Sequence, residues 1–506
     1  MTETNFKRKI PRTLVFSHGM THNECINVLV GRNKIDLFSI DGCNSDYGSF
    51  PVSILHLLKN PSLFAERMDI PISEKMIENY PVFFERHFSK FWAMIERHKY
   101  LCDISRFDQV ASYFNILYRY FYHIISSNNI DLLILFEIPH SDGYTEVLYQ
   151  VAKLLNIKII LCHPCYIDNT PMIFLLPDME ALSNHDQLLK TNEKTIKIQQ
   201  IIPSYTIGLM NDILQRQKKL NRCSTFFYPF YNIYNGITRL IKRLFIYSTN
   251  VISKGHIIDS FFIKRGIKLL LLGLCNIING FLYQRRLVKF AKRESQINWN
   301  TKYIYFPLHN QPELSTLPLG DVYVDQLYAI ECIARIIPNE WKIYVKENPL
   351  QAAGGLRIID SSFIWRDWSF FFKRMQRNPQ IVLVRENIDT NRLIEKSEFI
   401  ATITGTAGWE SILAGKSVLY FGNAWYGSFS GCTRFTSEIT VDEILENQPD
   451  HNKIQDSINK LVQRLTQCCL YRLQSNSVKD FDINQNAQIM ADAFEKYITY
   501  FFPEQN

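Results

Sequence analysis

The sequence lacks the features that mark several large classes of protein. Charged residues make up only 21% of the chain, against 46% hydrophobic residues, so a mainly disordered protein is excluded. The mean hydropathy of −0.11 is too low for a polytopic membrane protein. An internal repeat of fixed period and a low-complexity tract are missing as well. The 506 residues suffice for about three domains, or for two large ones with an insertion.

A disulfide framework and a secretory signal are also missing. The 11 cysteines are an odd number, and they are scattered from Cys25 to Cys469 without repeated spacing. This favours reduced thiols in a cytoplasmic protein. The basic N-terminus is not followed by an apolar run, because Pro11 and Arg12 interrupt it, so we expect no secretory signal.

Acidic residues are nearly absent from residues 214–293. This segment holds 16 Lys or Arg and a single acid, Asp259, which gives it a net charge of +15 in a chain of +7. The rest of the chain is therefore mildly acidic, which argues against a general nucleic-acid binder. The apolar run 267–283 contains Lys268 and is short for a membrane span.

These features of residues 214–293 predict an interfacial amphipathic helix that binds an anionic membrane surface. The alternative is a helical linker that packs on its own protein. We expect a cytoplasmic protein that is peripheral on the inner membrane.

Strand and helix patterns alternate on both sides of the basic segment. We expect an α/β fold with a Rossmann-like domain at 1–205, the basic helical segment at 206–297, a second Rossmann-like domain at 298–480 and a last helix within 481–506. The expected strands are residues 13–16, 130–137, 157–162, 303–307, 341–345, 381–384, 399–402 and 418–421. The expected helices are residues 143–155, 325–337, 407–414 and 485–502, and 51–127 is mostly helical with aromatic residues that pack a core.

A turn of small residues carries the sharpest functional signal. A strand ends at Thr402, and Thr404, Gly405 and Thr406 then form a turn that opens a helix. Such a turn, with the free N–H groups of a helix N-terminus, suits a phosphate or carboxylate. Glu410 lies about one turn further on, placed to bond a sugar hydroxyl. The alternative is an ordinary helix cap with a first-turn acid.

Two further segments follow expected strands and so lie at the carboxyl edge of the sheet, where ligands bind in α/β folds. Lys346 could pair with a phosphate there, although a solvated lysine in a turn is the default alternative. His309, Gln311 and Glu313 could recognise a base or sugar, or one of them could act as an acid or base.

The first domain offers its own candidates at a strand end. Glu137, His140 and Asp142 follow a buried strand, where a carboxylate can act as nucleophile or base. The alternative is a helix cap at residue 141 or 142 with a partly exposed histidine.

Metal ligands are not apparent. The run Cys162-His-Pro-Cys165 has the spacing of a redox or zinc motif, but no second ligand pair accompanies it. His18 and His22 are four residues apart on an expected loop. We expect no metal and no cofactor.

Taken together and in this order, the segments resemble the bacterial capsule polysaccharide synthesis family, which includes transferases of Kdo (3-deoxy-manno-oct-2-ulosonic acid) from CMP-Kdo. The residues that carry the resemblance are Leu308-His-Asn-Gln-Pro-Glu313, Lys346-Glu-Asn-Pro349, Thr402-Ile-Thr-Gly-Thr-Ala-Gly-Trp-Glu410 and residues 415–426, with a weaker likeness around 137–140. The resemblance implies a GT-B-like architecture, in which two Rossmann-like domains face a cleft and the final helix crosses back to the first.

By that resemblance, Lys346 and the turn Thr404–Thr406 hold the donor phosphate, and Glu410 holds the ribose. His309, Gln311, Glu313 and Asn348 complete the donor side. The family often has His-Pro where this chain has Asn348 and a proline, and an asparagine cannot carry charge or transfer a proton. Glu137, His140 and Asp142 remain the catalytic candidates.

The function indicated is a metal-independent glycosyltransferase of capsular or surface polysaccharide synthesis. Its partners would be a nucleotide-sugar donor, with a CMP-sugar favoured, a glycan or glycolipid acceptor, and the membrane surface. A catalytically silent binding subunit of an assembly complex is one alternative, kept open by Asn348. A nucleotide-sugar epimerase of the same fold is the other, and the basic segment counts against it.

Overall fold

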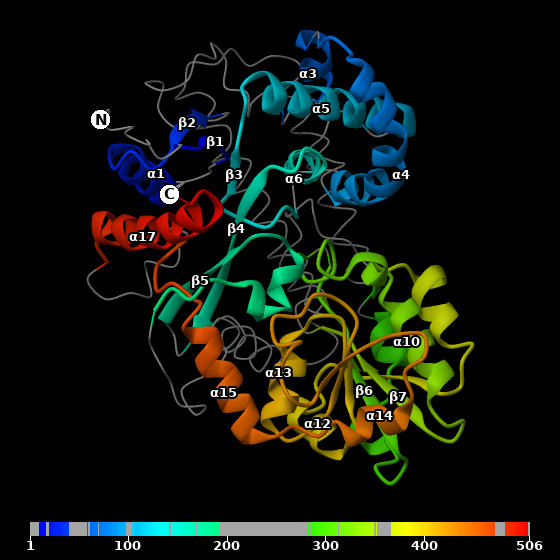
Figure 1. The fold of residues 1–506 in the computed structure, drawn as a ribbon. Coiled ribbons are helices and arrows are strands. Elements are labelled where there is room, and N and C mark those ends of the chain that lie inside the picture. The colour runs from blue at the N-terminus through cyan, green and yellow to red at the C-terminus, as the bar shows by residue number, and fades with distance from the viewer. Residues whose placement is uncertain are drawn as a thin grey trace, which may run out of the picture. The chain divides into compact units, whose positions relative to one another are not determined.

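The computed structural model of this chain describes residues 10–16, 20–39, 58, 61–68, 70–97, 104, 106–140, 143–167, 170–192, 282–283, 285–311, 313–348, 351, 366–470 and 481–503. The chain divides into two units, each built on one sheet (Figure 1). The first unit comprises Met1–Thr206, Asn423–Phe429 and Asp450–Asn506, and the second comprises Ile207–Gly422 and Ser430–Pro449. Most of the predicted basic helix, residues 206–281 and 284, lies outside the described residues.

The sheet of the first unit has five strands in the order β2-β1-β3-β4-β5. Its strands are β1 (Arg12–Phe16), β2 (Asp36–Ser39), β3 (Leu132–Leu135), β4 (Lys158–Ile167) and β5 (Thr170–Leu176). The first four are parallel, and β5 runs antiparallel to β4. All four residues of β3 are buried, as expected for a strand covered on both faces.

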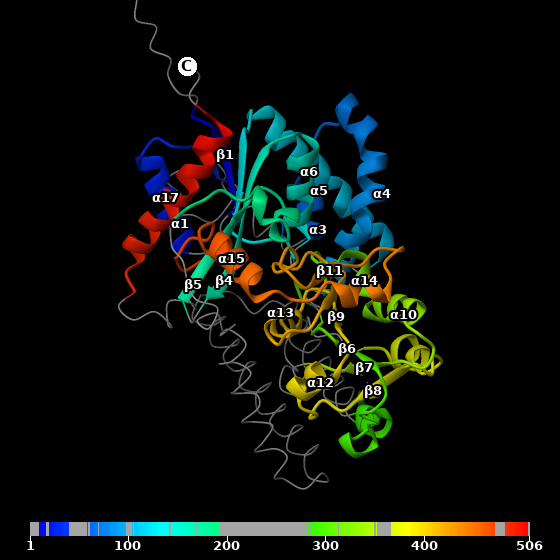
Figure 2. The ribbon, with the colours of Figure 1, turned by 60° about the horizontal axis from the view of Figure 1, so that its bottom comes forward.

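Helices cover both faces of this sheet (Figures 1 and 2). They are α1 (Met20–Gly31), α3 (Pro61–Arg67), α4 (Glu74–Arg97), α5 (Phe107–Ser127), α6 (Tyr144–Leu154), α15 (His451–Val462) and α17 (Ile483–Phe501). The last helix, α17, packs with α1 on one face of the sheet around a shared core, whereas α4, α5 and α6 lie on the other side. Aromatic residues of α4 and α5 pack against one another edge-on or at tilted angles, in the core that the sequence predicts.

The sheet of the second unit has six parallel strands in the order β11-β10-β9-β6-β7-β8. Its strands are β6 (Tyr303–Pro307), β7 (Lys342–Lys346), β8 (Ile381–Val384), β9 (Ile400–Thr402), β10 (Val418–Tyr420) and β11 (Cys432–Arg434). Its helices include α10 (Gln326–Ile336), α12 (Thr390–Lys396), α13 (Thr406–Leu413) and α14 (Val441–Glu446). Numbered from β6, this is the doubly wound order 3-2-1-4-5-6. The predicted fold class, two parallel-sheet α/β domains, is confirmed.

The later part of the chain belongs to both units. The expected second domain was residues 298–480, but residues 423–429 and those from Asp450 onward lie with the first unit. Two backbone hydrogen bonds between Ile173 of β5 and Thr466, with N···O distances of 2.8 and 3.0 Å, attach this late segment to the first sheet. The described helices contain none that is long and apolar enough to cross a membrane.

Candidate functional site

The two strand ends at the centre of the second sheet form its topological switch point. The chain leaves β6 toward β7 and β8, and later returns to the other side of β6 as β9. At such a point the loops after the two central strands diverge, which leaves room for a ligand at the carboxyl edge. His309 follows β6, and the turn Thr404–Thr406 follows β9, so the fold brings these two predicted elements to one place.

His309 links the two strand ends through its ring. Its Nε2 lies 3.2 Å from the backbone nitrogen of Ile403, 3.4 Å from that of Thr404 and 3.2 Å from Oγ1 of Thr402. Backbone N–H groups can only donate, so Nε2 is unprotonated and the ring proton is on Nδ1. Burial, together with the positive charge of Arg366, lowers the pKa of His309 to about 3. The ring is therefore neutral at physiological pH, and it positions the turn after β9.

Glycine is required where this turn meets His309. A Cβ on Gly405 would lie 2.9 Å from Cε1 of His309 and 2.9 Å from Oγ1 of Thr402. Thr404 is held from its other side, because its hydroxyl donates to the carbonyl of Ser315 at 2.8 Å. The N-cap residue of α13, Gly405, makes no side-chain cap bond, its N–H donates to Oγ1 of Thr402 at 3.2 Å, and Thr406 is exposed. The first turn of α13 thus presents backbone N–H groups, as the sequence predicts.

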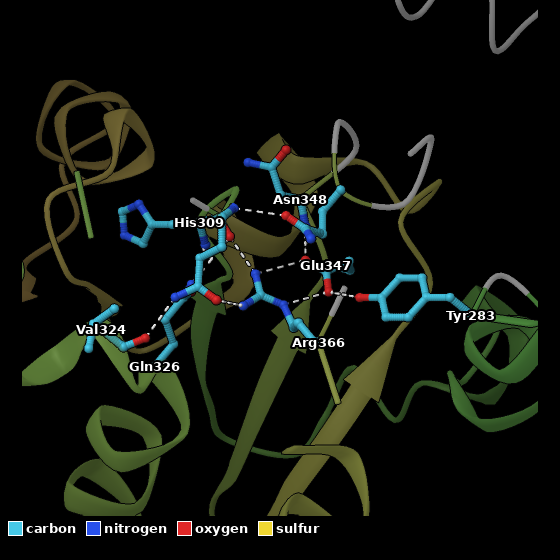
Figure 3. Close-up of polar contacts among 9 residues, drawn as sticks. Tyr283, His309, Val324, Gln326, Glu347, Asn348 and Arg366 are labelled. Atoms are coloured by element: carbon cyan, nitrogen blue, oxygen red, sulfur yellow. Dashed lines mark hydrogen bonds and ion pairs between the residues drawn. The ribbon is translucent and has the colours of Figure 1, made fainter. Parts of the chain in front are cut away.

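A buried ion pair lies at the ends of β6 and β7 (Figure 3). Nε of Arg366 is 2.7 Å from Oε2 of Glu347, and both side chains are 2% exposed. The same guanidinium donates to the carbonyl of His309 and, at 3.0 Å, to Oε1 of Gln311. The hydroxyl of Tyr283 donates to Oε2 of Glu347. One arginine therefore joins the loop after β6 to the loop after β7.

Lys346, the last residue of β7, is buried rather than solvated in a turn. Its Nζ donates to the carbonyl of Ile388 at 2.5 Å and to Oγ1 of Thr390 at 2.8 Å. Burial lowers the pKa of Lys346 to about 8, while the carboxylates of Asp389, Glu386 and Glu410 oppose this change. These contacts direct the ammonium toward the start of α12.

Glu410 on α13 interacts electrostatically with Lys346. Its side chain reaches solvent, yet enough protein surrounds it that desolvation raises the pKa of its carboxyl above the ordinary value. The nearby Lys346 acts in the opposite direction and lowers that pKa. An accessible carboxylate on α13 therefore interacts with the buried lysine at the end of β7.

The remaining donor-side candidates take different positions. Gln311 is held on both sides, since its Nε2 donates to the carbonyl of Val324 at 2.7 Å and its Oε1 accepts from Arg366. Glu313 is exposed, and one of its oxygens accepts from the hydroxyl of Ser315. The backbone N–H of Asn348 donates to Oε1 of Glu347 at 2.8 Å. Gln311 and Asn348 thus belong to the network around Arg366, while Glu313 lies on the surface.

The candidates of the first unit lie at its own switch point, between β1 and β3. Glu137 and His140 are half-buried just beyond β3, and Nδ1 of His140 lies 2.9 Å from the carbonyl of Ile138. Asp142 lies outside the described residues. His22, from the first turn of α1, stacks on Phe136 with ring centroids 4.2 Å apart.

The described residues hold no cluster of three or more His, Cys, Asp or Glu that could bind a metal ion. Cys162 and Cys165 both lie on β4. Because successive side chains of a strand alternate between its faces, residues three apart point to opposite faces. Their spacing is therefore that of a strand and not of a chelating pair. His18 lies outside the described residues.

Part of the second unit matches a known protein family. Residues 325–468 match the family described as "Capsule polysaccharide biosynthesis protein". The resemblance indicated by the motifs is confirmed for this segment, which contains Lys346, Asn348, the turn Thr404–Thr406 and Glu410. A search of curated proteins gave no match.

Solved structures with a distant likeness include two that are described as Kdo transferases and one epimerase. They are the β-Kdo 2,4 transferase KpsC of Thermosulfurimonas dismutans (10% identity, TM-score 0.29, 67% of this chain and 82% of that one) and its β-Kdo 2,7 transferase (10%, 0.29, 75% and 89%). The third is the UDP-GlcNAc 2-epimerase of Methanocaldococcus jannaschii (10%, 0.22, 74% and 96%).

Three residues of the site were not among the sequence candidates: Glu347, Arg366 and Tyr283. Glu347 lies between two of the sequence candidates, Lys346 and Asn348. Arg366 follows a stretch without strand or helix pattern, and its partners are 19 to 57 residues away. No local signal could have found it.

Proposed function

We propose that this protein is a glycosyltransferase of capsular or surface polysaccharide synthesis, which binds a nucleotide-sugar donor at the β6/β9 switch point of its second unit. The observation that carries the proposal is the turn Thr404–Thr406. It opens a helix at the carboxyl edge of a doubly wound sheet, where phosphate groups bind, within the segment that matches the capsule family.

The donor's phosphate would be held by Lys346 and by the N–H groups of the first turn of α13. His309 accepts from the amides of Ile403 and Thr404, and Oγ1 of Thr402 accepts from that of Gly405 at 3.2 Å, so the amides considered for a phosphate begin at Thr406. Glu410 lies one turn further along α13 and would bond the ribose hydroxyls. In this assignment His309 and Gln311 shape the site and do not touch the donor.

Nucleotide binding tests the proposal directly. A thermal-shift panel of CMP, CDP, UDP, GDP and dTDP is expected to show selective stabilisation by CMP, as for a Kdo-type or related CMP-sugar transferase. A ligand at about 100 times its Kd stabilises by about 2.7 kcal/mol. Selective binding of another nucleotide would keep the transferase but assign it a different donor. No response to any of the nucleotides would favour a catalytically silent assembly subunit.

A matched pair of lysine variants shows whether Lys346 takes part. Lys346→Ala should abolish the shift caused by the nucleotide. Lys416→Ala is the control, because Nζ of Lys416 also bonds a backbone carbonyl of the same unit, that of Ser397 at 2.8 Å. An equal loss in both variants would count against a specific role for Lys346.

The acceptor side and the chemistry would belong to the first unit, where Glu137, His140 and Asp142 are the candidates for nucleophile or base. Glu137→Gln should reduce sugar transfer while leaving nucleotide binding intact. We also propose that transfer needs no metal ion. Activity should survive EDTA, and a loss that Mg²⁺ or Mn²⁺ restores would contradict this.

We further propose that the basic segment attaches the protein to an anionic membrane surface. In its described end, Tyr283, Leu287 and Ala291 are spaced by four residues and buried in the core of the second unit. Exposed cations lie between and beyond them, and Val288 is 50% exposed. Each well-placed cation contributes about 1 kcal/mol of attraction to anionic lipid.

Co-sedimentation with vesicles tests this attachment. The protein should pellet with vesicles that contain phosphatidylglycerol and remain in solution with phosphatidylcholine alone. Replacing Lys289 and Lys292 by Glu should weaken the binding, whereas replacing Lys453 and Lys460 of α15, which are also exposed, should not. Equal binding to both kinds of vesicle would argue for a linker that packs on its own protein.

A further inference from the structure

Arg366 makes contacts that its burial alone does not require. Its guanidinium donates to three groups that come from the ends of two strands: the carbonyl of His309, Oε1 of Gln311 and the carboxylate of Glu347 (Figure 3). Loops after strands have no ladder of hydrogen bonds to hold them, so their geometry depends on such side chains. Arginine suits this task because its five donors have a rigid planar arrangement.

The contacts continue from Arg366 to both halves of the proposed donor site. On one side, the carboxylate of Glu347 accepts from the backbone N–H of Asn348 at 2.8 Å, two residues after Lys346. On the other side, the main chain of His309 is fixed twice, because its carbonyl accepts from Arg366 and its N–H donates to Oε1 of Gln326 at 2.7 Å. The ring of the same histidine then accepts the amides of Ile403 and Thr404.

Stability does not explain this arrangement well. Removing two charges from water costs several kcal/mol per ion, and hydrophobic replacement of a buried ion pair is often neutral or stabilising. A polar network in this position is instead suited to fixing one geometry of the groups around it.

We infer that Arg366 is a positioning residue of the donor site: through Glu347 and His309 it sets the loop after β7 and the turn after β9 in the relative positions that bind the nucleotide. This inference rests on the proposed function for the identity of the ligand. The positioning itself concerns described contacts within the second unit and can be measured without any ligand.

The ligand-free experiment is amide hydrogen exchange on the full chain. Arg366→Lys keeps the charge but loses the planar set of donors. We expect faster exchange in peptides that cover residues 346–348 and 402–406, with other peptides of the second unit unchanged. Unchanged exchange in both peptides would overturn the inference, and so would a uniform increase across the unit, which indicates general destabilisation.

The second experiment measures the Kd of the nucleotide that the wild-type protein binds in the panel above. Arg366→Lys should raise it by about tenfold to a hundredfold, which is the size expected when binding groups are displaced without being removed. The variant Arg366→Met with Glu347→Leu should unfold at a temperature close to that of the wild-type protein and still lose affinity. A lower unfolding temperature with an unchanged Kd would mean that Arg366 is merely structural.

Arg464 of the first unit provides the matched control. It also donates to backbone carbonyls, those of Leu188 and Lys460, and it pairs with the carboxylate of Asp186 at 3.6 Å. Arg464→Lys should leave both the Kd and the two peptides unchanged. If the wild-type protein binds no nucleotide of the panel, the proposed donor site fails, and the exchange experiment still decides the role of Arg366.

Discussion

Each sheet has a buried histidine at its switch point, and the two histidines have opposite hydrogen-bonding roles at Nε2. His22 stacks on Phe136, and its Nε2 lies 2.9 Å from the carbonyl of Leu470, so that nitrogen must donate. His309 faces the N–H groups of Ile403 and Thr404, so its Nε2 must accept. The two Nε2 atoms therefore have opposite roles, one a donor and the other an acceptor, determined by their partners.

This difference separates a histidine that anchors the fold from one that shapes a site. The carbonyl of Leu470 accepts from His22 and also from the hydroxyl of Thr21 at 2.8 Å, so the first switch point holds a late segment of its own chain. At the second switch point, Nε2 of His309 accepts from the start of the turn that is proposed to bind a phosphate. The chemistry of the partner therefore indicates the role of each histidine.

The largest expected effect comes from deleting the two rings. His309→Ala removes a buried ring and the acceptor of two amides, which should lower the free energy of unfolding by about 2–4 kcal/mol. It should also weaken nucleotide binding by tenfold or more, about 1.4 kcal/mol. His22→Ala should destabilise comparably and leave the nucleotide Kd unchanged, as measured by titration below the unfolding temperature. Equal losses of affinity would remove the distinction between the two histidines.

Substituting one glycine in each unit should show the same difference between the two units, with smaller changes in stability. Gly405→Ala places a Cβ within 2.9 Å of His309 and Thr402, and the required shift should cost about 1–3 kcal/mol and weaken nucleotide binding. Gly31→Ala at the end of α1 meets nothing within 4 Å, so it should be neutral or stabilise by up to about 1 kcal/mol. Urea unfolding and nucleotide titration of both variants measure this. A tolerated Gly405→Ala would show that the turn is not tightly packed.

The pH dependence of stability tests the neutral state of His309. Its folded pKa of about 3 lies below the ordinary value of 6.5, so between these values the unfolded chain holds a proton that the folded chain does not. The free energy of unfolding should therefore fall as the pH falls below 6.5, by at most about 1.4 kcal/mol per pH unit from this group.

His309→Gln supplies the comparison for this measurement. The Oε1 of glutamine can accept the same amides and does not titrate, so the variant should lose less stability between pH 6.5 and 5.5 than the wild-type protein. His163 and His185 of the first unit, whose pKa burial lowers to about 4, contribute equally to both proteins. Parallel urea titrations of the two proteins would measure the difference, and identical slopes would mean that His309 becomes protonated in the folded state.

The smallest effect is expected at the exposed charges that join α1 and α17. Arg32 pairs with Asp492 at 2.6 Å and with Glu495 at 3.3 Å. Such surface pairs contribute up to about 1 kcal/mol and are screened by salt. Arg32→Ala should lower the unfolding temperature slightly in low salt, less in 0.5 M NaCl, and leave nucleotide binding unchanged. A salt-independent loss would indicate packing by the arginine side chain instead.

Local patterns predicted most strands and helices but not the contacts between their ends. The expected strand 303–307 is β6 as observed, and the expected helices at 325–337 and 407–414 agree with α10 and α13 within a residue at each end. The antiparallel strand β5 was not predicted, because a short apolar run with a proline has no distinctive period. Apolar runs and caps act over a few residues, and these are the interactions that a sequence displays.

In the candidate site too, local patterns predicted some residues, and contacts distant in the sequence determine the others. The turn Thr404–Thr406 and Lys346 could be placed at the carboxyl edge because each follows a strand pattern. Whether His309 would face a ligand or the main chain could not be predicted, since its partners are more than 90 residues away. Arg366 was missed for the same reason.

The division of the chain between its units has a consequence for synthesis on the ribosome. The second unit is complete once Pro449 has emerged, although it begins only at Ile207. The first unit begins to emerge earlier, but Thr466, which bridges β5, and α17, which packs in its core, are made last. Domains generally fold as units during synthesis, N-terminal first. Here the chain of the second unit is complete first, so the part of the first unit that is made earliest still lacks some of its native contacts when the second unit has all of its own residues.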